Sequence, residues 1–156
     1  MGLEIERKFL VTGNGWRGRG EVLEIRQGYL AREGACVVRV RVAGERAWLT
    51  VKGRTVGISR PEYEVQIPVC EALEMLENLC LKPLMEKRRT RLESGGLIWE
   101  VDEFLGENAG LIVAEVELTS PDQPVPLPDW VGQEVSGDPR YFNSNLLIHP
   151  FTRWTP

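Results

Sequence analysis

Two acidic residues and one basic residue alternate near the start of the chain, in the pattern Glu4-x-Glu6-x-Lys8. On a β-strand the side chains of alternate residues share a face, so these three would lie on one side while Ile5 and Phe9 lie on the other. Two carboxylates held about 7 Å apart along a strand repel each other unless a cation lies between them. The stretch therefore indicates a metal site to which later strands would add ligands.

Charged pairs with the same spacing recur along the chain, and in each of them both residues carry the same sign. These pairs are Arg39/Arg41, Glu62/Glu64, Lys87/Arg89, Glu100/Asp102 and Glu115/Glu117. A solvated sheet face normally mixes the two signs, because like charges at neighbouring positions destabilise a sheet. The segregation of sign by strand therefore indicates a bound ligand, and it disfavours the alternative of an ordinary antiparallel sheet with a solvated outer face.

The two kinds of charged face suit different parts of one ligand. Carboxylates prefer hard cations such as Mg²⁺ or Mn²⁺. Arginines and lysines bind anionic oxygens, and arginine does so through two parallel donors. A metal ion beside a dense basic wall indicates a compact polyanion such as a phosphate chain. An open nucleic-acid surface fits less well, because few aromatic residues interleave with the basic positions.

The strands that must position these residues are predicted from period-2 alternation and turn residues. They cover residues 3–11, 21–32, 35–43, 47–52, 60–67, 84–94, 97–104 and 111–118. Helices are predicted at 68–81 from an apolar stripe, at 129–135, and at 138–148, where Asp138 and Pro139 have N-cap and N1 chemistry. Eight strands joined mostly by short turns predict an α+β fold, an eight-stranded antiparallel β-barrel with a charged interior flanked by a few helices.

Length and composition indicate the number of domains, the cellular location and the state of the cysteines. The 156 residues suit a single domain, 1–156, and no apolar run approaches the about 20 residues that cross a bilayer. With no apolar signal segment near the start, we expect a cytoplasmic protein. The three cysteines, Cys36, Cys70 and Cys80, are odd in number and not spaced as metal pairs, which predicts buried, reduced thiols.

In this order, the charged motifs resemble the CYTH superfamily, also called triphosphate tunnel metalloenzymes, and specifically its short bacterial inorganic triphosphatases. The resemblance rests on Glu4-x-Glu6-x-Lys8, Arg39-x-Arg41, Thr50-x-Lys52, Glu62-x-Glu64, Lys87-x-Arg89, Glu100-x-Asp102 and Glu115-x-Glu117, and it runs to residue 146. It implies an eight-stranded antiparallel tunnel that binds a triphosphate with Mg²⁺ or Mn²⁺. The segment around Arg140 and Tyr141 resembles the one that closes a tunnel end in this family, although ordinary helix packing would explain it equally well.

The resemblance also implies roles for individual residues. The main metal ligands would be Glu4, Glu6 and Glu117, with Glu115 and either Glu64 or Asp102 supporting a second metal or the attacking water. The phosphates would be held by Lys8, Arg39, Arg41, Lys52, Lys87 and Arg89, and the basic face would be extended by Arg60 and Arg91. Catalysis would involve Lys8, Lys52 and Glu115.

The activity implied by the resemblance is metal-dependent hydrolysis of inorganic triphosphate to pyrophosphate and phosphate. Two other enzyme activities remain as alternatives, a class IV-type adenylyl cyclase and a thiamine or nucleoside triphosphatase. The alternative that is not an enzyme is a polyphosphate-binding module. Cyclases of this family tend to carry a His-Phe pair before the acidic strand, whereas here the sole histidine is His149. A simple polyanion binder would gain little from the acidic set Glu4, Glu6 and Glu117.

The expected partner is a small-molecule triphosphate, with no nucleic acid and no membrane, and a homodimer remains open. Five tryptophans could stack a nucleobase, but such residues more often lie in a core or at a rim. The sequence therefore favours an inorganic phosphate chain over a nucleotide.

Overall fold

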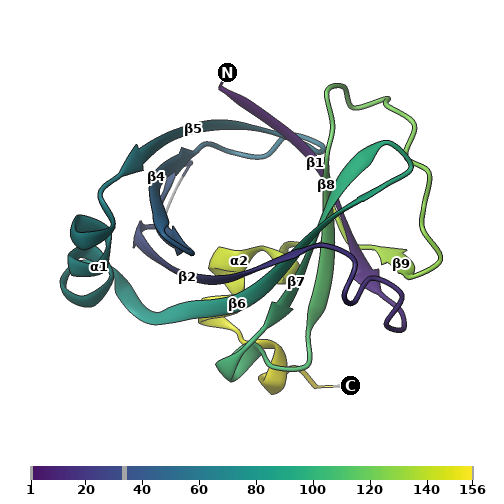
Figure 1. Ribbon diagram of the computed structural model, residues 1–156. Helices are drawn as coiled ribbons and strands as arrows, with labels where there is room; N and C mark the ends of the chain where they lie inside the picture. The colour runs from purple at the N-terminus through teal and green to yellow at the C-terminus, as the bar shows by residue number, and fades with distance from the viewer. Residues whose placement is uncertain (1, 33–34, 156) are drawn as a thin grey trace.

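Eight antiparallel strands close into a barrel in the computed structural model, which describes residues 2–32 and 35–155 (Figure 1). The strands are β1 (Leu3–Val11), β2 (Glu21–Ala31), β3 (Val37–Ala43), β4 (Arg46–Lys52), β5 (Ser59–Ile67), β6 (Leu81–Ser94), β7 (Leu97–Phe104) and β8 (Ile112–Glu117). Their spatial order is β5-β4-β3-β2-β6-β7-β8-β1, and β1 closes the ring by pairing with both β8 and β5. The predicted eight-stranded antiparallel barrel is confirmed.

Two tight turns depend on glycines with positive φ. Gly44, between β3 and β4, has φ +60°, while Gly95 and Gly96, between β6 and β7, have φ +61° and +78°. Residues with a Cβ rarely adopt this conformation, so glycine makes these short hairpin connections possible. Both turns were predicted from the sequence, and both set the register of the charged strands.

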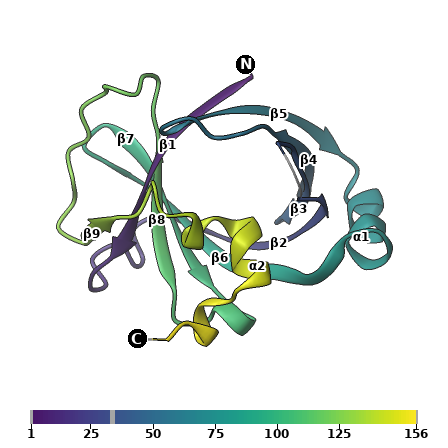
Figure 2. The ribbon, with the colours of Figure 1, turned by 180° about the vertical axis from the view of Figure 1, so that it is seen from behind.

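The apolar faces of the strands point outward and are partly covered by the remaining elements, while Leu3, Tyr63 and Val65 on β1 and β5 are exposed. Helix α1 (Val69–Asn78) packs outside β3 and β4, where Ala72 and Leu76 cover Val40 and Ala47. Helix α2 (Asn143–Ile148) lies at one end of the barrel (Figure 2). Three shorter one-turn helices are η1 (Gly106–Asn108), η2 (Pro139–Tyr141) and η3 (Phe151–Arg153). No helix among residues 2–32 and 35–155 is long and apolar enough to cross a membrane.

The predicted helix at 129–135 is wrong, because this segment forms a ninth strand, β9 (Val131–Glu134). It pairs with β1, with Val131 opposite Val11 and Glu134 opposite Phe9. β8 pairs with one edge of β1, and β5 pairs with the other edge only over residues 3–5, so the rest of that second edge is open. Hydrogen bonding to that edge outweighs the weak local preference for a helix.

The other two predicted helices are shorter than expected. The helix at 68–81 ends at Asn78, and β6 begins at Leu81 because that part of the strand pairs with β2. The helix at 138–148 is interrupted at Phe142, whose φ −69° and ψ 132° are extended. Asp138 does act as a cap, since its carboxylate accepts a hydrogen bond from the Arg140 backbone N–H, but it caps η2 and not α2.

The prediction of three buried thiols is wrong for two of the cysteines. Cys36 and Cys70 are exposed, and only Cys80 is buried. Cys36 immediately precedes β3, and Cys70 is in the first turn of α1, on the side away from the barrel. All three are free thiols.

Candidate functional site

The inward faces of the strands line a cavity of about 250 Å³ within the barrel. Twelve of the fourteen predicted site residues border it. These are Glu4, Glu6, Lys8, Arg39, Arg41, Lys52, Arg60, Glu64, Lys87, Arg89, Glu115 and Glu117. Because all eight strands contribute alternate residues to the same interior, side chains far apart in the sequence meet there.

The two remaining residues, Arg91 and Asp102, do not line this cavity. Arg91 lies towards the end of β6, opposite Glu21 and Glu100, and is exposed. Asp102 is fully buried in the barrel wall. The structure therefore does not place Arg91 or Asp102 in the lining of the cavity.

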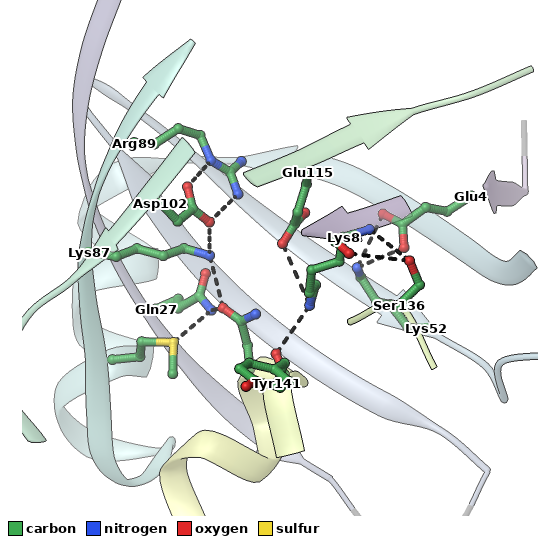
Figure 3. A network of polar contacts seen from close by, with 12 residues as sticks. Glu4, Lys8, Gln27, Lys52, Lys87, Arg89, Asp102, Glu115, Ser136 and Tyr141 are labelled. Carbon is green, nitrogen blue, oxygen red and sulfur yellow. Dashed lines mark hydrogen bonds and ion pairs between the residues drawn. The ribbon is translucent and has the colours of Figure 1, made fainter. Parts of the chain in front are cut away.

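The basic side chains that line the cavity are called the basic wall, and Asp102 holds two of them, Lys87 and Arg89, in place. Its carboxylate accepts hydrogen bonds from Arg89 Nε at 2.7 Å and Arg89 Nη2 at 2.9 Å, and it lies 2.8 Å from Lys87 Nζ (Figure 3). Burial alone would raise the pKa of Asp102, but the neighbouring Arg89 and Lys87 charges outweigh it and lower the pKa. The ionised carboxylate thus fixes the directions of both basic side chains.

Arg39 and Arg41 form the other part of the basic wall and share one carboxylate. Their Nη2 atoms lie 3.7 and 3.5 Å from Glu64 Oε2. Thr50 Oγ1 donates a 2.7 Å hydrogen bond to the same oxygen. Burial, together with the nearby positive charges of Arg39 and Arg89, lowers the pKa of Arg41 to about 10. This crowding of positive charge would be relieved by a bound polyanion.

Lys8 and Lys87 reach the end of the cavity that Phe142, Asn143 and Ser144 of the C-terminal segment also line. Lys8 Nζ donates to the Tyr141 carbonyl at 3.2 Å, and Lys87 Nζ donates to Asn143 Oδ1 at 2.8 Å. Burial lowers the pKa of Lys87 to about 8, even though Asp102 acts in the opposite direction. Tyr141 of η2 and Asn143 of α2 are thereby each tied to a lysine that lines the cavity.

The acidic wall contains a pair of opposed carboxylates. Glu6 of β1 is paired in register with Glu117 of β8. Burial, followed by repulsion from Glu115 and Glu4, raises the pKa of Glu6 well above its ordinary value. The pKa of Glu117 is also raised, mainly by burial. Neither residue has an ion-pair partner among the described residues, so the pair lacks a neutralising cation.

Glu115 differs from its neighbours because basic residues surround it. It is paired in register with Lys8, and its Oε1 lies 3.7 Å from Lys8 Nζ. Burial would raise the pKa of Glu115, but Lys8, Lys87 and Arg89 outweigh this effect and hold the pKa far below its usual range. Glu115 is therefore ionised where the acidic wall meets the basic wall.

The acidic residues fit a hard divalent cation by their chemistry. No three His, Cys, Asp or Glu side chains within residues 2–32 and 35–155 converge closely enough to hold a metal ion. However, Glu4, Glu6 and Glu117 all border one cavity, and burial raises the pKa of each of them. Burial disfavours the ionised form of these carboxyl groups. A bound Mg²⁺ or Mn²⁺ would stabilise that ionised form through its own positive charge.

The sequence reasoning gave no role to several residues that contribute to the site. Glu62 lines the cavity and lies 3.1 Å from Lys52 Nζ, and its alternation with Glu64 was a usable signal. Tyr29 also lines the cavity. Its position two residues after Gln27, on the same face of the predicted strand, was a usable signal. Asn143 accepts hydrogen bonds from Lys87 and Gln27. Nothing local marks Asn143, since only the tertiary fold brings it to the cavity.

A closed antiparallel barrel with an acidic and a basic wall around one lumen defines the class of protein. The family model described as the CYTH domain matches residues 2–142, and the chain belongs to this family.

Two curated relatives are similar over nearly their whole length. The inorganic triphosphatase of Acetivibrio thermocellus is 52% identical over 151 residues, which cover 97% of this chain and 97% of the relative. The inorganic triphosphatase of Nitrosomonas europaea is 39% identical over 150 residues, covering 93% of this chain and 97% of the relative. A crystal structure of an inorganic triphosphatase matches with a TM-score of 0.67 and 34% identity, covering 97% of this chain and 99% of that one.

Proposed function

We propose that this protein hydrolyses inorganic triphosphate to pyrophosphate and phosphate inside the barrel. The single observation that carries the proposal is that the crowded cations and the crowded carboxylates border the same cavity. A phosphate chain and a divalent cation would neutralise the two walls together. The two relatives that are inorganic triphosphatases support the same reaction.

In this proposal the basic wall binds the phosphate chain. Its residues are Lys8, Arg39, Arg41, Lys52, Arg60, Lys87 and Arg89. Phosphoryl transfer depends mainly on alignment of the phosphate chain and on stabilisation of its developing charge. Asp102 and Glu64 hold the side chains of this wall in place through the ion pairs described above.

The acidic wall would hold the divalent cation through Glu4, Glu6 and Glu117. When bound, Mg²⁺ or Mn²⁺ would supply charge neutralisation and would activate water. Glu115, which is ionised, can accept a hydrogen bond from the attacking water and so orient it. Lys8, opposite Glu115, can neutralise the phosphate from which the leaving group departs.

The lining of the cavity favours an inorganic chain over a nucleotide. None of the tryptophans within the described residues borders it. Trp16, Trp99 and Trp130 belong to a hydrophobic cluster on the outside of the barrel. The aromatic residues that do border the cavity are Tyr29 and Phe142, so no tryptophan within the described residues can stack on a base there.

The setting of the enzyme follows as part of the same proposal. A cytoplasmic location is supported by the three free cysteines. A homodimer is supported by exposed apolar side chains on the outer face of β1 and β5, namely Leu3, Tyr63 and Val65. Sedimentation equilibrium over a range of concentrations would test the dimer.

A product assay tests the proposed reaction. The protein is incubated with triphosphate, ATP or thiamine triphosphate, each with Mg²⁺ or Mn²⁺, and the products are identified. We expect pyrophosphate and phosphate from triphosphate at a higher kcat/KM than for either of the other substrates. Cyclic AMP as the main product from ATP, or binding of triphosphate without turnover, would overturn the proposal.

A further inference from the structure

Lys52 links two carboxylates of the acidic wall across β5. It ends β4 and is paired in register with Glu62 of β5, whereas Glu4 lies on β1, on the far side of β5. The Lys52 ammonium lies 3.1 and 3.3 Å from the two carboxylate oxygens of Glu4 (Figure 3). It also lies 3.1 Å from Glu62 Oε2. The three side chains are largely buried, so solvent ions screen these pairs only weakly.

The other half of the acidic wall has no such cation. Glu6 and Glu117 face each other without an ion-pair partner in the described part of the chain. The carboxylates are therefore divided into two groups, of which one contacts Lys52 and the other has no cationic partner in the described part of the chain.

We propose that Lys52 is the resident counter-ion of the acidic wall and must release Glu4 before a divalent cation can bind there. Both oxygens of Glu4 contact the ammonium, so a cation that takes Glu4 as a ligand competes directly with Lys52. Lysine suits this exchange, because its compact charge sits on a flexible four-carbon stem. The inference deepens the proposed function and rests on it for the use of a metal.

The release of Lys52 couples the two ligands of the site. Lys52 borders the cavity, so its freed ammonium can contact a phosphate oxygen. Without phosphate, the freed ammonium would keep only Glu62 as a partner and would lose both contacts to Glu4, which costs free energy in a buried site. Metal binding and phosphate binding therefore favour each other, and each raises the affinity for the other by the same factor.

Calorimetric titration of metal-free protein with Mn²⁺, in the absence of any phosphate, tests the exchange. We expect Lys52→Met to bind Mn²⁺ about tenfold more tightly than wild type, which corresponds to about 1.4 kcal/mol. Lys52→Arg keeps a positive charge near Glu4 and should retain weak binding. The matched control is Lys87→Met, which removes a buried ammonium that pairs with Asp102 and not with Glu4, and its Mn²⁺ affinity should stay within about twofold of wild type.

An Mn²⁺ affinity of folded Lys52→Met equal to or weaker than that of wild type would overturn the inference. A second measurement needs no variant. Addition of Mg²⁺ to wild type should shift the ¹⁵N resonance of the Lys52 ammonium and leave that of Lys87 in place, and an unmoved Lys52 resonance would equally refute the exchange. Neither readout involves hydrolysis, so the inference and the proposed reaction can fail independently.

Discussion

Glu6 and Glu117 lie directly opposite each other in the β1–β8 ladder, with their carboxylates on the inner face of the barrel. Like charges at directly opposed positions of a sheet destabilise it. The arrangement is therefore unfavourable in the protein alone, and a cation shared between the two side chains, as we propose, would make it favourable. This relationship separates a binding site from an ordinary charged sheet surface.

The first prediction concerns Glu6→Gln. We expect phosphate release from triphosphate to fall by at least about 100-fold, because an amide is a poorer metal ligand than a carboxylate. The metal-free variant should be more stable than wild type by up to about 1 kcal/mol, because one of two opposed charges is removed.

Two assays check the Glu6→Gln prediction, namely initial rates with triphosphate and urea unfolding in the presence of a chelator. The pKa of Glu6 is raised in the folded state, so its ionisation costs stability as pH rises above the usual range of a carboxyl group. The stability difference between the variant and wild type should therefore widen from pH 4 towards pH 7. Unchanged turnover in Glu6→Gln would remove Glu6 from the metal site.

A second prediction concerns Asp102→Asn. Asp102 is the shared partner of Lys87 and Arg89, and its removal leaves two buried cations without their carboxylate. Breaking a buried pair in this way costs about 3–5 kcal/mol. Urea unfolding should show this loss. Glu103→Gln is the matched control, because Glu103 lies next to Asp102 in β7 but pairs with Arg17 on the outside of the barrel, and it should change stability by less than about 1 kcal/mol.

The pH dependence of substrate binding provides a third prediction. Burial lowers the pKa of Lys87 to about 8, so this ammonium loses its proton as pH rises through that value. The KM for triphosphate should therefore rise above pH 8, while it changes little between pH 6.5 and 7.5. Steady-state kinetics on Lys87→Arg give the control, since arginine stays charged and should flatten the rise. A KM that is constant to pH 9.5 in wild type would show that Lys87 does not contact the substrate.

The fourth prediction concerns the C-terminal segment at the end of the cavity. Asn143 Oδ1 accepts hydrogen bonds from Lys87 and from the fully buried Gln27. Asn143→Ala leaves both donors without this acceptor and should reduce the free energy of unfolding by about 1–3 kcal/mol. Asn145→Ala is the matched control, because the Asn145 amide bonds to the Pro139 carbonyl on the exposed side of the segment. Equal losses in the two variants would contradict the role given to Asn143.

Local alternation in the sequence was enough to predict the barrel strands, the inward charged faces and twelve of the cavity-lining side chains. The reason is geometric: a strand has a period of two residues, so the face of every side chain follows from its position once one neighbour is placed. The same rule predicted that Glu4, Glu6 and Lys8 share a face before any partner strand was known.

Only the tertiary structure decided which charges meet. Lys52 reaches Glu4 because barrel closure places β1 next to β5, and Asp102 became a support for Lys87 and Arg89 because it is buried in the wall. Residues 131–134 became a strand because β1 had an open edge to pair with. Each of these outcomes depends on contacts between residues distant in the chain. Residue spacing fixes which face a side chain occupies, but barrel closure and burial determine its neighbours.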